Sequence, residues 1–307
     1  MSESKNIAVM GAGLMGHGIA LVFARQGHNV IVHDPHEKAM QSLHDRIRQS
    51  MNNLGADNSN IDFTINNVLA GNSLSEAVVN ADFVFEAAPE NLELKQTLFE
   101  NIEQAAPEQC VLASNTSVMP ISSIMQHLEH KERAVGTHWW NPPHLIPLVE
   151  VIRTQWTNVS SVDSVFNLLA DAGKSPVRVE KDVPGFIGNR LQHALWREAI
   201  SLVENGICTA DAVDLVVKES FGRRLAVLGP LENADLVGTD LTLAIHEQVL
   251  HDLERSDGPS PKLKELVNTG KLGMKSGEGF QQWSSKAAEN TTRRVSEHLL
   301  ALEKILP

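Results

Sequence analysis

The chain has 307 residues, 42% hydrophobic and 21% charged, which is an ordinary globular composition for a protein of about two domains. Its formal net charge of -12 argues against a nucleic-acid partner and against an anionic membrane surface, because both contacts need clustered Lys and Arg. Two cysteines are too few for a disulfide framework or a metal-ligand set, so we expect no metal and a cytoplasmic setting.

The first half of the chain alternates short apolar runs with helical runs. Strands are predicted at 7–10, 29–33, 83–87, 111–114, 134–139, 148–152 and 176–179. Helices are predicted at 14–26, 37–54, 92–105 and 162–172, and a capping box of Ser73 and Glu76 marks one more helix start. The uncharged run 7–24 contains four glycines, which favours a turn over a membrane span. The alternation predicts a parallel sheet with right-handed crossovers.

From Pro184 onward the pattern is helical. Helices are expected at 186–205, 209–220, 236–253 and 289–305, and no strand is evident. The predicted fold class is therefore α/β, with a Rossmann-type doubly wound parallel sheet over residues 1–183 and an all-α domain over residues 184–307.

A glycine-rich turn joins the first predicted strand to the first helix. The run Gly11-Ala12-Gly13-Leu14-Met15-Gly16 matches GxGxxG, in which the glycines permit a tight turn, close approach to a pyrophosphate and helix packing. Asp34 closes the second strand, 18 positions after Gly16, and no Arg or Lys follows it immediately. A carboxylate there accepts hydrogen bonds from ribose hydroxyls and repels a 2′-phosphate. The sequence therefore predicts NAD as the cofactor rather than NADP.

Polar residues that suit alcohol oxidation stand near the ends of later strands. His138 ends one predicted strand, Glu150 lies on the next, and Ser117 follows an earlier one. Oxidation of an alcohol needs a base for the hydroxyl proton, and a carboxylate on the second ring nitrogen orients an imidazole for that task. Because ligands bind at the carboxyl ends of strands in such sheets, we expect these residues to form a site for a small-molecule substrate.

Five ordered motifs resemble the 3-hydroxyacyl-CoA dehydrogenase family over residues 6 to about 283. They are Asn115-Thr116-Ser117, His138-Trp139-Trp140-Asn141-Pro142, Leu148-Val149-Glu150-Val151, the run from Pro184 to Arg190, and the run from Gly270 to Phe280. The resemblance implies His138 as catalytic base with Glu150 as its partner, and Ser117, Asn141 and Asn189 as groups that position the substrate.

The same resemblance extends to the cofactor and to the assembly. It implies that Glu90 and Lys95 lie near the nicotinamide half of NAD, that Asn115 also binds the cofactor, and that a homodimer forms through the helical domain. Ordinary structural roles are also possible for two residues that the resemblance singles out. Asn189 suits an anchor of the long helix, and Lys95 suits a solvated helix residue.

One departure from the acyl-CoA members concerns the substrate. No Lys or Arg occurs between Arg48 and Lys95, where those members supply basic contacts to the CoA phosphates. The run from Asn141 to Leu148 also resembles the branch that acts on small free hydroxy acids, which includes L-gulonate 3-dehydrogenase with λ-crystallin, carnitine dehydrogenase and a pyridine-carboxylate dehydrogenase. We therefore predict a small free 3-hydroxy acid. Candidate carboxylate binders are Asn141, His144, Arg190, Arg197, Arg223 and Arg224.

Three alternatives stay open. The first is an L-3-hydroxyacyl-CoA dehydrogenase, in which backbone amides, Arg46 or Arg48 reach the CoA phosphates. The second is a catalytically silent protein on this fold. The third is a Ser/His/Glu hydrolase, which is disfavoured because the chain has no GxSxG elbow and the nucleotide motif would have no use.

Overall fold

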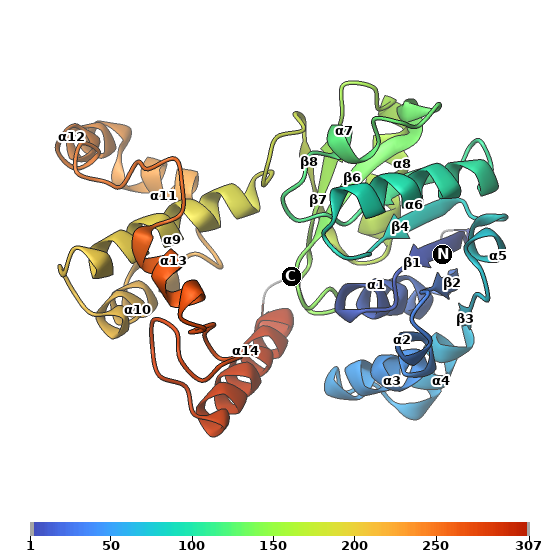
Figure 1. The fold of residues 1–307 in the computed structure, drawn as a ribbon, viewed down its shortest axis with the longest axis horizontal. Coiled ribbons are helices and arrows are strands. Elements are labelled where there is room, and N and C mark those ends of the chain that lie inside the picture. The colour runs from blue at the N-terminus through green and yellow to red at the C-terminus, as the bar shows by residue number, and fades with distance from the viewer. Residues whose placement is uncertain (1–2, 306–307) are drawn as a thin grey trace. The chain divides into compact units, whose positions relative to one another are not determined.

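The computed structural model describes residues 3–305, and the chain divides into two compact units (Figure 1). Unit 1 comprises residues 1–190 and 298–307, and unit 2 comprises residues 191–297. No helix in the described part of the chain is long and apolar enough to cross a membrane.

Unit 1 is built on one eight-stranded sheet in the order β3-β2-β1-β4-β5-β6-β7-β8. The strands are β1 (Asn6–Met10), β2 (Asn29–His33), β3 (Val68–Ala70), β4 (Phe83–Glu86), β5 (Val111–Ser114), β6 (Ala134–Trp139), β7 (Leu148–Arg153) and β8 (Ser175–Val179). The chain runs outward from β1 to β3 and then returns to place β4 on the other side of β1. This switch point is where doubly wound sheets bind nucleotides.

Two strands, β7 and β8, run against the direction predicted for them, because the reversal at β7 is kept in β8. Six of the seven neighbouring strand pairs are parallel, but β6 and β7 are antiparallel. The reason is the connection at residues 140–147, which is too short for the crossover of a dozen or more residues that a parallel pair requires. In this register His138 lies directly opposite Glu150, on the same face of the sheet.

Helices cover both faces of the sheet, as Figure 1 shows. One buried cluster joins α1 (Leu14–Arg25), α3 (Leu43–Asn53), α4 (Asn58–Asn66) and α8 (Val159–Asp171) to the sheet. A second cluster joins α5 (Leu74–Val78), α6 (Leu92–Ala105) and α7 (Ile121–Ile124) to the opposite face. Burial of one large apolar side chain contributes about 1.5–3 kcal/mol, so these two layers supply most of the stability of unit 1. The predicted fold class is confirmed.

Two helices that were each predicted as one are interrupted. Residues 37–54 form α2 (Glu37–Gln41) and α3, divided at Ser42, whose hydroxyl donates to the carbonyls of Lys38 and Ala39. The helix predicted from residue 236 is α11 (Pro230–Val237) and α12 (Thr239–Val249), divided at Gly238 with φ 100°. In both places a local backbone preference overrides the apolar periodicity.

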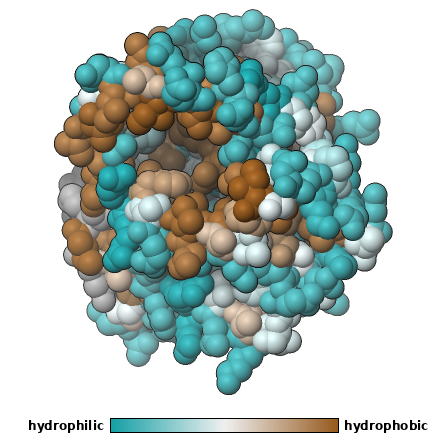
Figure 2. All heavy atoms as spheres, turned by 90° about the vertical axis from the view of Figure 1, so that its left-hand side faces the viewer, coloured by the Kyte–Doolittle hydropathy of each residue, from teal (hydrophilic) through white to brown (hydrophobic). Residues whose placement is uncertain are grey.

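Unit 2 is helical but has almost no buried core of its own. Its helices are most of α9 (Gly188–Glu204), α10 (Ala210–Glu219), α11, α12, α13 (Pro261–Asn268) and most of α14 (Ser285–Ile305). Leu266 is its one buried apolar residue among those described, whereas Leu231 and Leu236 are 80% and 70% exposed. Figure 2 looks onto this unit and shows apolar side chains spread widely over its face.

Candidate active site

The glycine-rich turn has the geometry that a dinucleotide needs. Gly11 has φ 109°, and a Cβ there would lie 2.6 Å from the carbonyl oxygen of Ala87. A Cβ on Gly16 would collide with the carbonyl of Gly11, so helix α1 packs closely only because position 16 has no side chain. Around Gly13, in contrast, nothing lies within 4 Å of an added Cβ. The turn therefore leaves open space in front of the first amides of α1, which suits a pyrophosphate.

Asp34 lies just after β2, where an adenosine ribose would lie. Its Oδ2 accepts a hydrogen bond from the amide of Ala12 at 2.8 Å, and its Oδ1 accepts one from the amide of His36 at 2.8 Å. Burial alone would raise the pKa of Asp34, but these hydrogen bonds outweigh it and the pKa is lowered. The residue is therefore a fixed carboxylate beside the glycine turn, and its Oδ2 retains a lone pair for a further donor, whereas Oδ1 also lies 3.1 Å from Nδ1 of His36.

His138 and Glu150 form a buried pair at the carboxyl end of β6. The Nδ1 atom of His138 lies 2.7 Å from Oε2 of Glu150, and both side chains are at most 4% exposed. With Nδ1 hydrogen-bonded to the carboxylate, Nε2 is the ring nitrogen left to exchange a proton with a ligand.

The second oxygen of Glu150 holds the start of α9. Oε1 accepts hydrogen bonds from the amides of Ile187 at 2.8 Å and Gly188 at 3.0 Å. Burial acts to raise the pKa of Glu150, but the bonds from His138 and the two amides lower it further than burial raises it. The carboxylate is thus ionised at neutral pH and fixed from both sides.

Two aromatic rings enclose the imidazole of His138. The ring centroids of Trp140 and Phe186 lie 5.2 and 5.7 Å from that of His138. Phe186 adopts a left-handed φ of 49°, and a Cβ on Gly188 would collide with the indole of Trp140. The Pro184 to Arg190 motif is therefore the turn that encloses the His138–Glu150 pair.

The two predicted substrate-positioning residues, Ser117 and Asn189, lie together. The side-chain amide of Asn189 donates to the carbonyl of Ser117 at 2.7 Å, while the Ser117 amide donates to Glu90 Oε1 at 3.1 Å. Asn115 is used structurally, since its Oδ1 accepts from the amide of Trp139 at 3.0 Å. The exposed Ser117 side chain thus stands on a loop that is fixed at both ends.

Lys95 is not the solvated helix residue of the alternative interpretation. Its side chain is fully buried, and its Nζ lies 2.6 Å from Glu86 Oε1 and 3.4 Å from Glu90 Oε2. The carbonyl of Ala88 is a third acceptor at 3.3 Å. An ammonium has three hydrogens, so this one is fully occupied by the protein and influences a ligand only through its partners.

The residues of the connection between β6 and β7 differ in what they offer a substrate. Asn141 is exposed and is the second residue after β6, which ends at Trp139. His144 lies against His17 of α1, with ring centroids 6.3 Å apart, and its Nδ1 is buried without a partner. Burial, with nearby His17 and Lys174, lowers the pKa of His144 to about 4. A neutral His144 cannot supply the positive charge considered for it, whereas Asn141 remains accessible.

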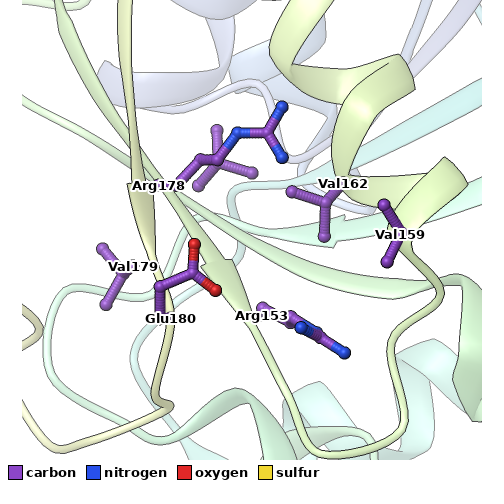
Figure 3. Close-up of a pocket in the computed structure, with 7 residues that line it drawn as sticks. Arg153, Val159, Val162, Arg178, Val179 and Glu180 are labelled. Carbon is purple, nitrogen blue, oxygen red and sulfur yellow. The ribbon is translucent and has the colours of Figure 1, made fainter.

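A cavity of about 190 Å³ lies elsewhere, between β7, β8 and α8 (Figure 3). It is lined by Val151 and Arg153 of β7, which alternate with Glu150 and so point to the opposite face of the strand. Arg178, at its rim, is paired with Asp163 at 2.8 Å. This cavity therefore does not belong to the His138 site. Among the described residues, no group of three or more His, Cys, Asp or Glu side chains is placed to hold a metal ion.

Sequence reasoning overlooked three residues that shape the site. Glu86 is fully buried at the end of β4, and Trp140 and Phe186 pack against His138. A signal existed for Glu86, because an acidic residue ends an otherwise apolar strand. Trp140 and Phe186 stand inside the family motifs, but the motifs predicted no role for either ring, and the contact of Phe186 with His138 joins segments far apart in the chain.

Two family models match the chain in succession. The model for "3-hydroxyacyl-CoA dehydrogenase, NAD binding domain" matches residues 6–183, and the model for "3-hydroxyacyl-CoA dehydrogenase, C-terminal domain" matches residues 185–283. Together they cover most of the sequence, and the first contains every residue of the glycine turn and the His138–Glu150 pair.

Individual relatives fall into two groups by the names of their substrates. A 5-formyl-3-hydroxy-2-methylpyridine 4-carboxylate 5-dehydrogenase from Mesorhizobium japonicum is 33% identical over 98% of both chains. A crystal structure described under that enzyme name, as an NAD+-dependent dismutase, covers 99% of both chains with a TM-score of 0.91. The human mitochondrial hydroxyacyl-coenzyme A dehydrogenase is 35% identical over 91% of both chains. An L-carnitine dehydrogenase from Streptomyces griseus is 39% identical over 77% of this chain and 70% of its own.

Proposed function

Since the chain belongs to the 3-hydroxyacyl-CoA dehydrogenase family and is an NAD-dependent oxidoreductase acting on hydroxyl groups, we propose that it oxidises a small free 3-hydroxy acid to the ketone. The predicted family, cofactor and enzyme class are thereby confirmed. The glycine turn, the open space at Gly13 and the carboxylate of Asp34 fit NAD. We retain residues 1–183 as the proposed cofactor domain, residues 184–307 as the proposed helical domain, and the cytoplasm as the proposed compartment.

The observation that carries the substrate proposal is the charge of residues 49–94. This segment contains seven acidic residues and no Lys or Arg. The two arginines before it are engaged elsewhere: the guanidinium of Arg46 donates to the carbonyls of Gly13 and Ala39, and that of Arg48 lies 3.4 Å from Asp62. A protein that binds CoA through its phosphates normally places free cationic donors opposite them.

The proposed reaction uses the two ring nitrogens of His138 in different ways. The glycine turn and Asp34 would hold NAD, which would supply the acceptor for the hydride of the carbinol carbon. Nε2 of His138 takes the hydroxyl proton as the carbon–oxygen double bond forms, and Glu150 stabilises the resulting imidazolium through Nδ1. Ser117, Asn141 and Asn189 are proposed to orient the substrate, and the rings of Trp140 and Phe186 restrict the access of water to the imidazole.

We expect free hydroxy acids to be better substrates than a CoA thioester. The comparison is kcat/KM for L-gulonate, carnitine, other free 3-hydroxy acids and pyridine carboxylates with an oxidisable side group, against L-3-hydroxybutyryl-CoA. The best free acid should exceed the thioester by at least about tenfold, which is about 1.4 kcal/mol in transition-state binding. A thioester that wins by the same margin would establish the acyl-CoA alternative, and no NADH from any compound would favour the silent protein.

The apolar surface of unit 2 leads us to propose a homodimer. Leu231 and Leu236 of α11 are among the most exposed apolar residues of the chain, and monomeric proteins rarely leave large contiguous apolar patches in water. Light scattering should give about twice the chain mass of 33.6 kDa. The double variant Leu231→Glu/Leu236→Glu should shift the protein toward the monomer, whereas Leu69→Glu on β3, where the leucine is 60% exposed, should not. A monomeric parent protein would exclude the proposal.

A further inference from the structure

The carboxyl ends of β4 and β5 carry a charge cluster with an unequal number of acidic and basic groups. It consists of Glu86, Glu90 and Lys95, so two carboxylates share one ammonium and the formal charge is -1. Glu86 and Lys95 are fully buried, whereas the side chain of Glu90 is 37% exposed. The surplus negative charge is therefore presented to a ligand by Glu90.

Hydrogen bonds from the protein fix this cluster. Glu86 accepts from the Ala88 amide and from the hydroxyl of Ser114, each at 2.6 Å. Oε1 of Glu90 accepts from the Thr116 hydroxyl at 2.5 Å and from the Ser117 amide at 3.1 Å. Because a single ammonium faces both carboxylates, the cluster keeps one negative charge.

The order of the strands places this cluster opposite the adenosine side. Asp34 ends β2 on one side of β1, and β4 lies on the other side, with the carbonyl of Ala87 packed against Gly11 of the glycine turn. A dinucleotide with its adenosine at Asp34 and its pyrophosphate at the turn extends its other half over β4 and β5. The nicotinamide therefore faces the strand ends that carry Glu90.

We propose that Glu90, with Glu86 and Lys95 behind it, makes the nicotinamide site net negative and so favours NAD+ over NADH; this inference rests on the proposed function. The oxidised ring carries a positive charge and the reduced ring is neutral. Two unit charges near a protein surface interact strongly enough for one carboxylate to favour the oxidised ring by about tenfold. The site then loads NAD+ readily and releases NADH, while the bound cofactor becomes a weaker oxidant by about 30 mV.

The test is the ratio of two dissociation constants in the absence of substrate. Calorimetry gives Kd for NAD+ and for NADH with the parent protein, Glu90→Gln and Glu90→Asp. The Gln variant keeps an oxygen for Thr116 and Ser117 but loses the charge, so Kd(NADH)/Kd(NAD+) should fall by about tenfold. The Asp variant keeps the charge, so its ratio should stay near that of the parent.

The matched control is Glu93→Gln. Glu93 is exposed in the first turn of the same helix, α6, and lies outside the hydrogen-bonded cluster, so its loss changes the net charge equally. Its ratio should equal that of the parent. If Kd(NADH)/Kd(NAD+) is unchanged in Glu90→Gln, or falls equally in Glu93→Gln, this inference is overturned and the proposed function is not. If the parent protein binds neither nucleotide, the proposed function fails and this inference fails with it.

Discussion

Replacing His138 with Gln should lower turnover by about a hundredfold or more while NAD affinity stays nearly unchanged. The substitution removes the imidazole that Glu150 orients to accept the hydroxyl proton. General-base catalysis of this kind contributes about 10²–10⁴-fold to the rate. The glycine turn and Asp34, which bind the cofactor in our proposal, are untouched. Steady-state turnover with the best substrate and the NAD dissociation constant are the two measurements.

A suitable control for His138→Gln is His36→Gln, because His36 is exposed and lies beside Asp34 rather than beside Glu150. Its turnover should remain within a few-fold of the parent value. Turnover of His138→Gln within threefold of the parent would remove His138 from the mechanism and would require another base.

Glu150→Gln should also lower turnover by about a hundredfold, for a reason that the geometry makes specific. The amide oxygen of Gln can still accept from Ile187 and Gly188, which turns its NH₂ group toward Nδ1 of His138. That nitrogen must then be the acceptor, so Nε2 carries the ring proton and cannot take one from the substrate.

The companion variant Glu150→Ala separates catalysis from stability. Alanine loses the two amide bonds as well, so its Tm should fall well below that of Glu150→Gln, while both variants have low turnover. The lowered pKa of Glu150 means that its ionic contribution to stability is complete above about 4.5 and is lost as the pH falls through the lower folded value. Turnover of Glu150→Gln close to that of the parent would argue against the pairing.

Much of the fold could be predicted because it depends on local patterns. The alternation of apolar and helical runs predicts the sheet, and GxGxxG marks its first turn. The direction of β7 could not be predicted from its apolar residues, because they look the same in either direction. Only the short connection at residues 140–147 carried that information. The helix breaks at Ser42 and Gly238 could not be predicted for a related reason, because the apolar periodicity continues across them.

Some residues of the candidate site could likewise be predicted from the sequence, and others could not. His138, Glu150 and Ser117 could be proposed because strand ends and family motifs single them out. The partnership of Glu86 with Lys95 could not, because a buried ion pair nine residues apart looks in sequence like a strand end followed by a solvated helix. Such a pair becomes evident only when burial and distances are known.

Glu150 accepts two hydrogen bonds at the start of α9, so a glutamate at this position is not by itself a sign of catalysis. A relative on this fold that had lost catalysis would still need an acceptor oxygen at that position to hold the turn, from Glu or Gln, and a donor such as Asn189 to hold the Ser117 loop. Polar side chains at both positions would therefore persist in a purely binding relative. His138 is the residue whose Nε2 is left to exchange a proton, so its presence says more about catalysis than the presence of Glu150 or Asn189.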